Sequence, residues 1–353
     1  SIIETFQNRI FLADLDDKSK VQYSKIRFEG RPVEFNDSLV INLNPKGGDI
    51  TGMKVLDDKL IMWKSDSMFY LSGTGPNNLG QQNNYIEPEQ ISADVGCVDK
   101  NSLVVTPFGI MFKSRKGIYL ISRSMEVLYI GAPVESFNSL TMSSAIVSPN
   151  NNQVRFTTTT GECLVYNHFL NQWSVFTNHT ALSAVLLNST YYYLRTDSHL
   201  YKENLLSFTD NGSPIKLRVE TGWLSLAGVQ GFKRMYRMVL LGTWKNSHKL
   251  RVRTAYNYID AYIHEKVIDS SEVVSEVLYG DDSPYGNGVY GGEKDLYQMT
   301  VEFKTQKCQS IKILIEDLQS LTGEGLELSH MLFIVGVKEN EFKLGNSKTF
   351  GVS

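Results

Sequence analysis

The side chains best suited to catalysis or metal binding are scattered along this sequence. The six histidines show neither an HExxH nor an HxH spacing: His168, His179, His199, His248, His264 and His330. The sequence therefore contains no zinc-protease motif and no compact metal cluster. The three cysteines, Cys97, Cys163 and Cys308, form no CxxC pair. We expect reduced thiols rather than a disulfide framework or a zinc site.

Two short motifs resemble binding loops only in part. Asp14, Asp16 and Asp17 suggest a calcium loop, but Lys18 occupies the fifth position and no acid closes the motif. The glycines of 73–80 lack the Gly-Lys-Ser/Thr of a phosphate loop. The sequence also lacks a Gly-x-Ser-x-Gly nucleophile elbow. We therefore expect no catalytic residue, no cofactor and no bound metal, and we expect that the protein is not an enzyme.

The charges of the C-terminal half follow a more informative pattern. No acidic residue occurs between Glu220 and Asp260, where seven cations occur: Lys233, Arg234, Arg237, Lys245, Lys249, Arg251 and Arg253. In the following stretch, 260–282, every charged residue except Lys266 is acidic. Because side chains alternate across a strand, Lys249, Arg251 and Arg253 share one face.

Three interpretations of these charges remain open. Neighbouring strands of one sheet can pair them, the basic face can meet an acidic face of another copy in a ring, or it can line a channel for DNA. We predict the seven cations as interface or DNA-channel residues. The glycine-rich segment Tyr279 to Gly292 is predicted to project from the domain as a second contact surface.

The elements that position these residues follow from composition. The chain has 353 residues, a formal net charge of −3, 42% hydrophobic and 21% charged residues. It has only nine alanines but 18 tyrosines and 17 phenylalanines, which favours a folded, mostly β protein. No apolar run reaches the roughly 18 residues of a membrane-spanning helix. The net charge of −3 excludes bulk electrostatic attraction to nucleic acid or to an anionic membrane as the basis of the protein's function.

One hairpin repeats through the first part of the chain. Its return strands carry tyrosines at positions 23, 70, 119, 166 and 201, at intervals of 47, 49, 47 and 35 residues. The five hairpins are 9–24, 60–71, 110–121, 154–166 and 191–201. Hairpin units with a period of about 40 to 50 residues are typical of β-propeller blades. We predict a β-propeller over 1–210, and the number of its blades within this chain stays open. The alternative is a β-sandwich whose hairpins resemble one another.

After the turn-rich segment at 210–214, longer alternating strands begin. We predict strands at 215–226, 232–244, 249–258, 296–304, 311–316 and 326–337. Six such strands are typical of a β-sandwich or jelly-roll-like domain, which we place at 211–353. The predicted fold is therefore all-β, with a propeller followed by a sandwich.

Several segments together resemble a family of phage proteins. They are 8–12 with 21–25, 50–64, 91–97, 109–119, and 326–336 followed by 343–351. In pattern and hydrophobic texture they look like the tail hub, or packaged-DNA stabilisation, proteins of short-tailed bacteriophages, which are related to the tail nozzle proteins. The resemblance covers most of the chain and includes no catalytic motif.

The resemblance implies a structural protein of the virion. It implies a homo-oligomeric ring, expected to be a hexamer, below the portal and adaptor, with other tail proteins as partners. The ring would retain packaged double-stranded DNA, touch it transiently during ejection, and assemble in the host cytoplasm. Family members usually have more sequence before the propeller, so the absent initiator methionine suggests a trimmed or partial chain. The alternative function is a glycan-binding propeller, a lectin or adhesin, with Trp63, Trp173 or Tyr192 as exposed platforms.

Overall fold

The computed structural model describes residues 2–13, 15–204, 206–225, 233–244, 248–269, 297–318, 323 and 325–337. In these residues the helices are three short 3₁₀ turns, Lys100–Ser102, Ala132–Phe137 and Pro149–Asn151. The rest of the regular structure is β, so the predicted all-β class is confirmed. The chain divides into two compact units, Ser1–Glu203 and Asn204–Ser353, whereas the sequence placed the boundary after residue 210.

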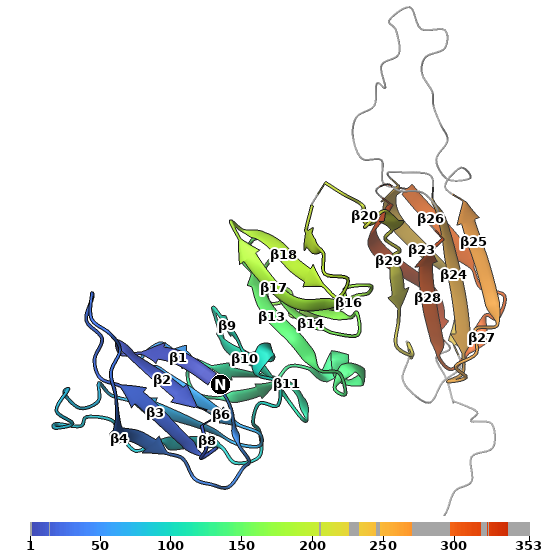
Figure 1. Cartoon of the computed structure of the whole chain (residues 1–353). Helices are drawn as coiled ribbons and strands as arrows, with labels where there is room; N and C mark the ends of the chain where they lie inside the picture. The colour runs from blue at the N-terminus through green and yellow to red at the C-terminus, as the bar shows by residue number, and fades with distance from the viewer. Residues whose placement is uncertain are drawn as a thin grey trace, which may run out of the picture. The chain divides into compact units, whose positions relative to one another are not determined.

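The first unit is a series of five small antiparallel sheets in chain order (Figure 1). The first two sheets contain β1 (Ile2–Phe6), β2 (Arg9–Ala13), β3 (Lys20–Ser24), β4 (Phe35–Asn42), and β5 (Ile50–Leu56), β6 (Lys59–Lys64), β7 (Met68–Ser72), β8 (Glu89–Ser92). The third contains β9 (Val104–Thr106), β10 (Gly109–Ser114), β11 (Gly117–Ser122) and β12 (Val127–Tyr129). The last two contain β13 (Met142–Ser148), β14 (Gln153–Thr158), β15 (Cys163–Asn167), β16 (Gln172–Phe176), and β17 (Ala181–Leu187), β18 (Thr190–Arg195), β19 (Leu200–Lys202).

The five predicted hairpins form the middle of the first four sheets and the last two strands of the fifth. They are β2–β3, β6–β7, β10–β11, β14–β15 and β18–β19. Each of the first four sheets adds one strand before and one after the hairpin, whereas the fifth has only three strands. First strands of neighbouring sheets contact one another, as β1 does β5 and β13 does β17. The blade architecture of a propeller is confirmed.

Neighbouring sheets are held together by a shared core at each junction. In β6, Leu60 and Met62 pack with the first sheet, whereas Ile61 and Trp63 pack with the third. The side chains of a strand alternate between its two faces, so an apolar run such as 60–63 buries both faces of one sheet. This explains why the second strands are continuously apolar rather than alternating.

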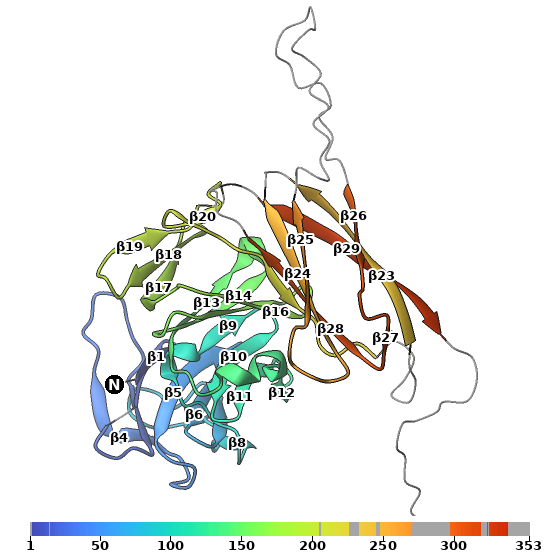
Figure 2. The ribbon, with the colours of Figure 1, turned by 90° about the vertical axis from the view of Figure 1, so that its right-hand side faces the viewer.

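The second unit is a sandwich of two four-stranded sheets (Figure 2). One sheet has the order β22 (Arg218–Glu220), β28 (Ile311–Asp317), β24 (Lys249–Tyr256), β25 (His264–Asp269). In the other, β23 (Lys233–Trp244) pairs with β26 (Tyr297–Glu302), β27 (Lys307–Cys308) and β29 (Leu326–Val337). A short hairpin, β20 (Thr209–Asp210) and β21 (Ser213–Pro214), precedes them. The core contains alternate residues of both sheets, among them Met238, Leu240, Val252, Ile313 and Ile315.

The sandwich confirms the predicted second architecture but differs in two strands. The predicted strand 215–226 is a strand only at Arg218–Glu220, with an isolated bridge from Leu224 to Ile311. The acidic stretch after Asp260 contains β25, which the sequence did not predict because its buried residue, Ile268, stands among charges. The predicted projecting segment Tyr279 to Gly292 lies outside the described residues.

Candidate interfaces and binding sites

The predicted basic strand β24 presents three cations on the outer face of its sheet. Lys249 is exposed and Arg251 and Arg253 are half-buried, while Leu250 and Val252 between them point into the core. On this face β24 lies between β25 and β28. Any partner that reaches these cations must therefore compete with the charges of two neighbouring strands.

Glu316 on β28 binds the two arginines of β24. Its carboxylate accepts hydrogen bonds from Arg251 Nη2 at 2.8 Å and from Arg253 Nη2 at 2.8 Å, and Arg218 Nη1 of β22 lies 3.7 Å away. Burial acts to raise the pKa of Glu316, but the hydrogen bonds from the two arginines outweigh it and lower that pKa. One carboxylate thus bridges three strands.

A second charged group lies on the same face around Glu220. Its carboxylate is 2.8 Å from Lys312 Nζ and accepts a hydrogen bond of 2.8 Å from Tyr262 Oη. These two hydrogen bonds, that of Lys312 first, lower the pKa of Glu220 to about 2. Lys312 also contacts Asp260 at 3.2 Å, and Lys249 contacts Asp269 at 2.9 Å.

The outer face is therefore close to electrically neutral. Each of Lys249, Arg251 and Arg253 has a carboxylate partner on an adjacent strand. Pairing between neighbouring strands was one of the three arrangements that the sequence left open. Cations already bound to carboxylates bind DNA phosphate weakly, because the local field is cancelled.

The other predicted cations belong to the second sheet or lie outside the described residues. Arg234 on β23 donates from Nε to Gln306 Oε1 at 3.1 Å and lies 5.5 Å from the centre of the Tyr236 ring. Arg237 is exposed, and its backbone pairs with Glu302 and Ile334. Lys233 begins β23, and Lys245 is outside the described residues. The seven cations are therefore adjacent in the sequence, but those that the structure describes belong to two different sheets.

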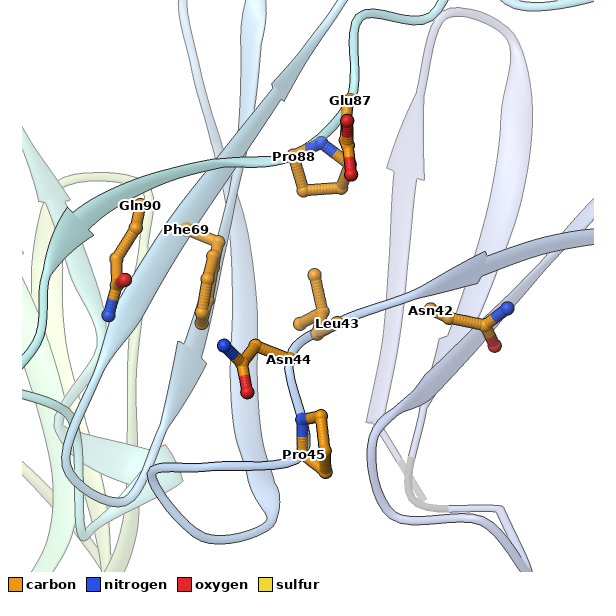
Figure 3. Close-up of a pocket in the computed structure, with 8 residues that line it drawn as sticks. All are labelled: Asn42, Leu43, Asn44, Pro45, Phe69, Glu87, Pro88 and Gln90. Atoms are coloured by element: carbon orange, nitrogen blue, oxygen red, sulfur yellow. The ribbon is translucent and has the colours of Figure 1, made fainter.

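A hollow of about 480 Å³ opens at the junction of the first and second sheets (Figure 3). Its lining residues are Asn42, Leu43, Asn44, Pro45, Phe69, Glu87, Pro88 and Gln90. Figure 3 shows Leu43 and Phe69 between Pro88 on one side and Pro45 on the other. Among the described residues, the side chains of Asn42 and Glu87 have no hydrogen-bond or ion-pair partner. The hollow thus combines an apolar floor with free polar groups.

The sequence did not reveal a buried cation in the second strand of each of the first four sheets. They are Arg9, Lys64, Lys113 and Arg155, and each is almost fully buried. Lys64 Nζ donates to Asn44 O at 2.6 Å, Ser19 Oγ at 3.1 Å and Lys46 O at 3.2 Å, all in the first sheet and its connection. Burial lowers the pKa of Lys64.

The other three cations also connect one sheet with the next. Arg9 donates to Ser24 O at 3.0 Å and to the carbonyl of Pro76, which belongs to the β7–β8 connection. Lys113 contacts Asp99, whose Oδ2 also accepts a hydrogen bond of 3.0 Å from the Met142 amide of the fourth sheet. These bonds fix the angle between sheets, because each joins two elements through a buried and therefore strong polar contact.

Arg155 and His179 make the junction of the fourth and fifth sheets polar. Arg155 Nη2 is 2.8 Å from Glu203 Oε1, and its guanidinium lies 4.8 Å from the centre of the Tyr191 ring. His179 Nε2 lies 3.1 Å from Tyr191 Oη. Burial, followed by the charges of Arg155 and Arg195, lowers the pKa of His179 to about 4. His179 is therefore neutral near pH 7.

Of the three aromatic residues expected as exposed glycan platforms, Trp63 belongs to the core and Trp173 packs against it. Trp63 is fully buried and lies 5.7 Å from Phe112 between ring centres. Trp173 packs on Tyr166 at 4.9 Å and donates from Nε1 to Ile130 O at 2.8 Å. The expectation was wrong for Trp63 because the apolar strand β6 is buried on both faces, whereas Trp173 is half-buried and its ring packs against the core. Tyr192 is half-buried on the far face of the fifth sheet.

Neither a metal cluster nor a membrane helix is found in the described part of the chain. No group of three or more His, Cys, Asp or Glu side chains there could hold a metal ion. None of the helices there has the length and apolarity needed to cross a membrane. The three cysteines are buried free thiols.

Comparisons with known proteins give no family. No protein-family model matches the chain, and no curated protein matches it. Among solved structures it is similar to PorZ, a bacterial surface component of the type-IX secretion system of Porphyromonas gingivalis, with TM-score 0.37 and 8% identity over 57% of this chain. The extracellular domain of the one-component system BT4673 of B. thetaiotaomicron gives 0.39 and 10% over 67%.

A further similarity is to an enzyme. The exo-β-1,3-galactanase of Phanerochaete chrysosporium gives TM-score 0.32 and 11% identity, covering 94% of this chain and 95% of the galactanase. The chain spans only 26% of PorZ and 30% of the BT4673 domain.

Proposed function

We propose that the protein is a structural component of a phage virion, forming the tail hub or nozzle ring below the portal and adaptor. It retains packaged DNA and provides the exit channel, and it works without catalysis. The observation that carries this proposal is the combination of two architectures in one chain. A series of blade-like sheets is accompanied by a β-sandwich, and the resemblance of the sequence implies a propeller beside a β-sandwich platform.

The electrostatics of the second unit support a conduit rather than a DNA-binding protein. The cations of β24 are paired with Glu316 and Asp269 on neighbouring strands. A wall that offered many free cations would hold the duplex through phosphate contacts and slow its passage. A nearly neutral wall allows transient contact and release.

The self-association of the purified chain tests the ring. We expect sedimentation velocity to show a ring-sized species at high concentration or in the presence of a portal–adaptor complex, with six copies as the expected number. Heterologous contacts close into a ring when the rotation per copy divides a full turn. A chain that stays monomeric under both conditions contradicts the proposal.

A second candidate function is glycan binding at the hollow between the first two sheets. The free carboxylate of Glu87 and the amides of Asn42 and Gln90 suit sugar hydroxyls, and Phe69 with the two prolines suits the C–H face of a sugar ring. This composition favours a neutral saccharide over an anion.

Saturation-transfer difference NMR with glucose, galactose and mannose tests the saccharide site. Binding that is saturable in wild type and at least fivefold weaker in Glu87→Ala supports it. Glu126→Ala serves as the matched control, since Glu126 is exposed in the β11–β12 connection, away from the hollow. Absence of signal from all three sugars, or equal signal from the two variants, overturns it.

A further inference from the structure

Each inner sheet of the blade series has one face against the preceding sheet and one against the following sheet. The first sheet has a free face of the preceding kind, and the fifth has a free face of the following kind. In the second strand of each inner sheet, alternate residues contact the preceding and the following sheet. In β6, Met62 faces the preceding sheet and Trp63 the following one. In β10, Phe112 faces the preceding sheet, where its ring centre lies 5.7 Å from that of Trp63. The same alternation in β2 and β18 defines one unpaired face at each end.

Among the described residues of the first unit, no sheet follows the fifth. Tyr191 and Tyr193 pack on the fourth sheet, so Tyr192 and Leu194 face away from it. Val185 and Leu187 lie on the same face, opposite Tyr192 and Thr190 in the register, and are 53% and 57% exposed. Leu200, which pairs with Leu194, is 67% exposed. This is a contiguous apolar surface on a folded sheet.

The first sheet lacks a preceding neighbour. Phe11 and Ala13 pack on the second sheet, so Ile10 and Leu12 face the other way. Ile3, Leu12, Gln22 and Val40 lie in register across the four strands on this face. Ile3 is 62% exposed, so within one chain the fifth sheet does not cover it.

We propose that these two faces bind each other between copies, the fifth sheet of one copy packing on the first sheet of the next. The inference rests on the proposed ring and names its contact. A head-to-tail contact requires two different surfaces that fit each other. Within this chain, four junctions already show that a face of the fifth-sheet type fits a face of the first-sheet type. A second copy is therefore the occupant whose chemistry is already known to match.

The inner junctions also predict which residues meet. Leu194 is the fifth residue of β18, as Trp63 is of β6. Leu12 is the fourth residue of β2, as Met62 is of β6 and Phe112 is of β10. Because Trp63 contacts Phe112, Leu194 of one copy is expected to contact Leu12 of the next. Sheet-on-sheet burial of such residues stabilises by about 25 cal/mol per Å² of apolar area.

Single-cysteine variants test this contact. Leu12→Cys and Leu194→Cys are purified separately, mixed, and oxidised, with the native cysteines buried and unable to compete. We expect disulfide-linked dimers in the mixture and at least fivefold less from either variant alone. The proposal is overturned if either variant alone crosslinks as strongly as the mixture, or if the mixture does not crosslink. It is also overturned if a variant that carries both substitutions forms only an intrachain disulfide.

Charge substitution provides a second readout that does not depend on disulfide geometry. Leu187→Glu should weaken self-association at least tenfold in sedimentation velocity, whereas Leu79→Glu should not. Leu79 is the matched control because it is 82% exposed and lies in the β7–β8 connection. Equal behaviour of the two variants counts against the contact. If rings form on the portal–adaptor complex while both tests fail, the inference is wrong and the proposed function stands.

Discussion

At the scale of single residues, the buried cations of the first unit are its least expected feature. Lys64 lies in β6, where every residue except Lys59 is buried, and it donates only to neutral oxygen atoms at hydrogen-bond distance. A buried ammonium group is costly unless each of its protons is bonded, and Lys64 satisfies this with three acceptors. The cation therefore acts as a clamp between the first and second sheets.

Replacement of this clamp should destabilise the protein. Lys64→Met keeps the length of the side chain but leaves the carbonyls of Asn44 and Lys46 unpaired. We expect a loss of about 2 to 4 kcal/mol in the free energy of unfolding. Urea denaturation measures it, with Lys59→Met of the same strand as the control, expected to change stability by less than about 1 kcal/mol. Equal losses in the two variants would show that Lys64 has no special role.

His179 should make the fifth sheet sensitive to acid. Its pKa falls from an ordinary 6.5 to about 4 in the folded protein, so between these values the unfolded chain binds more protons. Its contribution is complete above pH 6.5 and is lost as the pH falls towards 4. At pH 5 we expect a loss of about 2 kcal/mol relative to pH 7.5.

The matched variant for this pH effect is His179→Phe, which keeps an aromatic ring against Tyr191 and Tyr193. Urea denaturation of both proteins at pH 7.5 and pH 5 isolates the effect of His179 from that of other titrating groups. Wild type should lose about 2 kcal/mol more than the variant over this interval. Identical losses would mean that His179 is protonated equally in both states.

At the scale of elements, the hairpins could be predicted from the sequence, whereas most of the strands on either side of them could not. The tyrosine spacing predicted β2–β3, β6–β7, β10–β11, β14–β15 and β18–β19 because their strands are continuous and apolar. The outer strand β4, with Asn36 and Asp37, is half-polar and was not predicted. Lys64, Lys113 and Arg155 were missed as clamps because a cation beside a turn usually faces water. Trp63 was expected to be exposed but is buried. The residue type alone does not show whether a tryptophan side chain faces solvent or the core.

The charged face of the sandwich offers a prediction at this scale. Glu316→Ala leaves Arg251 and Arg253 without their shared carboxylate, which we expect to lower the stability of the second unit by about 1 to 3 kcal/mol. Differential scanning calorimetry should show a shift in one transition only, that of the unit containing β28. Glu265→Ala on β25 is the control, because Glu265 is exposed and has no ion pair in the described residues. A shift in both transitions would contradict separate units.

At the scale of the whole molecule, the net charge of −3 conceals local pairing rather than a uniform surface. The basic run on β24 and the acidic positions on β25 and β28 meet within one sheet. The contact surfaces that we propose for assembly are instead the apolar end faces of the blade series. An assembly held by apolar contacts and lined by paired charges suits a channel that DNA must leave quickly.

Electron microscopy of the chain bound to its portal–adaptor complex tests the central claim most directly. We predict a closed ring of copies below the adaptor, six in number, with the blade-like units of neighbours in contact and an open axial channel wide enough for duplex DNA. A monomer attached to the outside of the tail, or the absence of any density for this chain in the complex, would contradict the account.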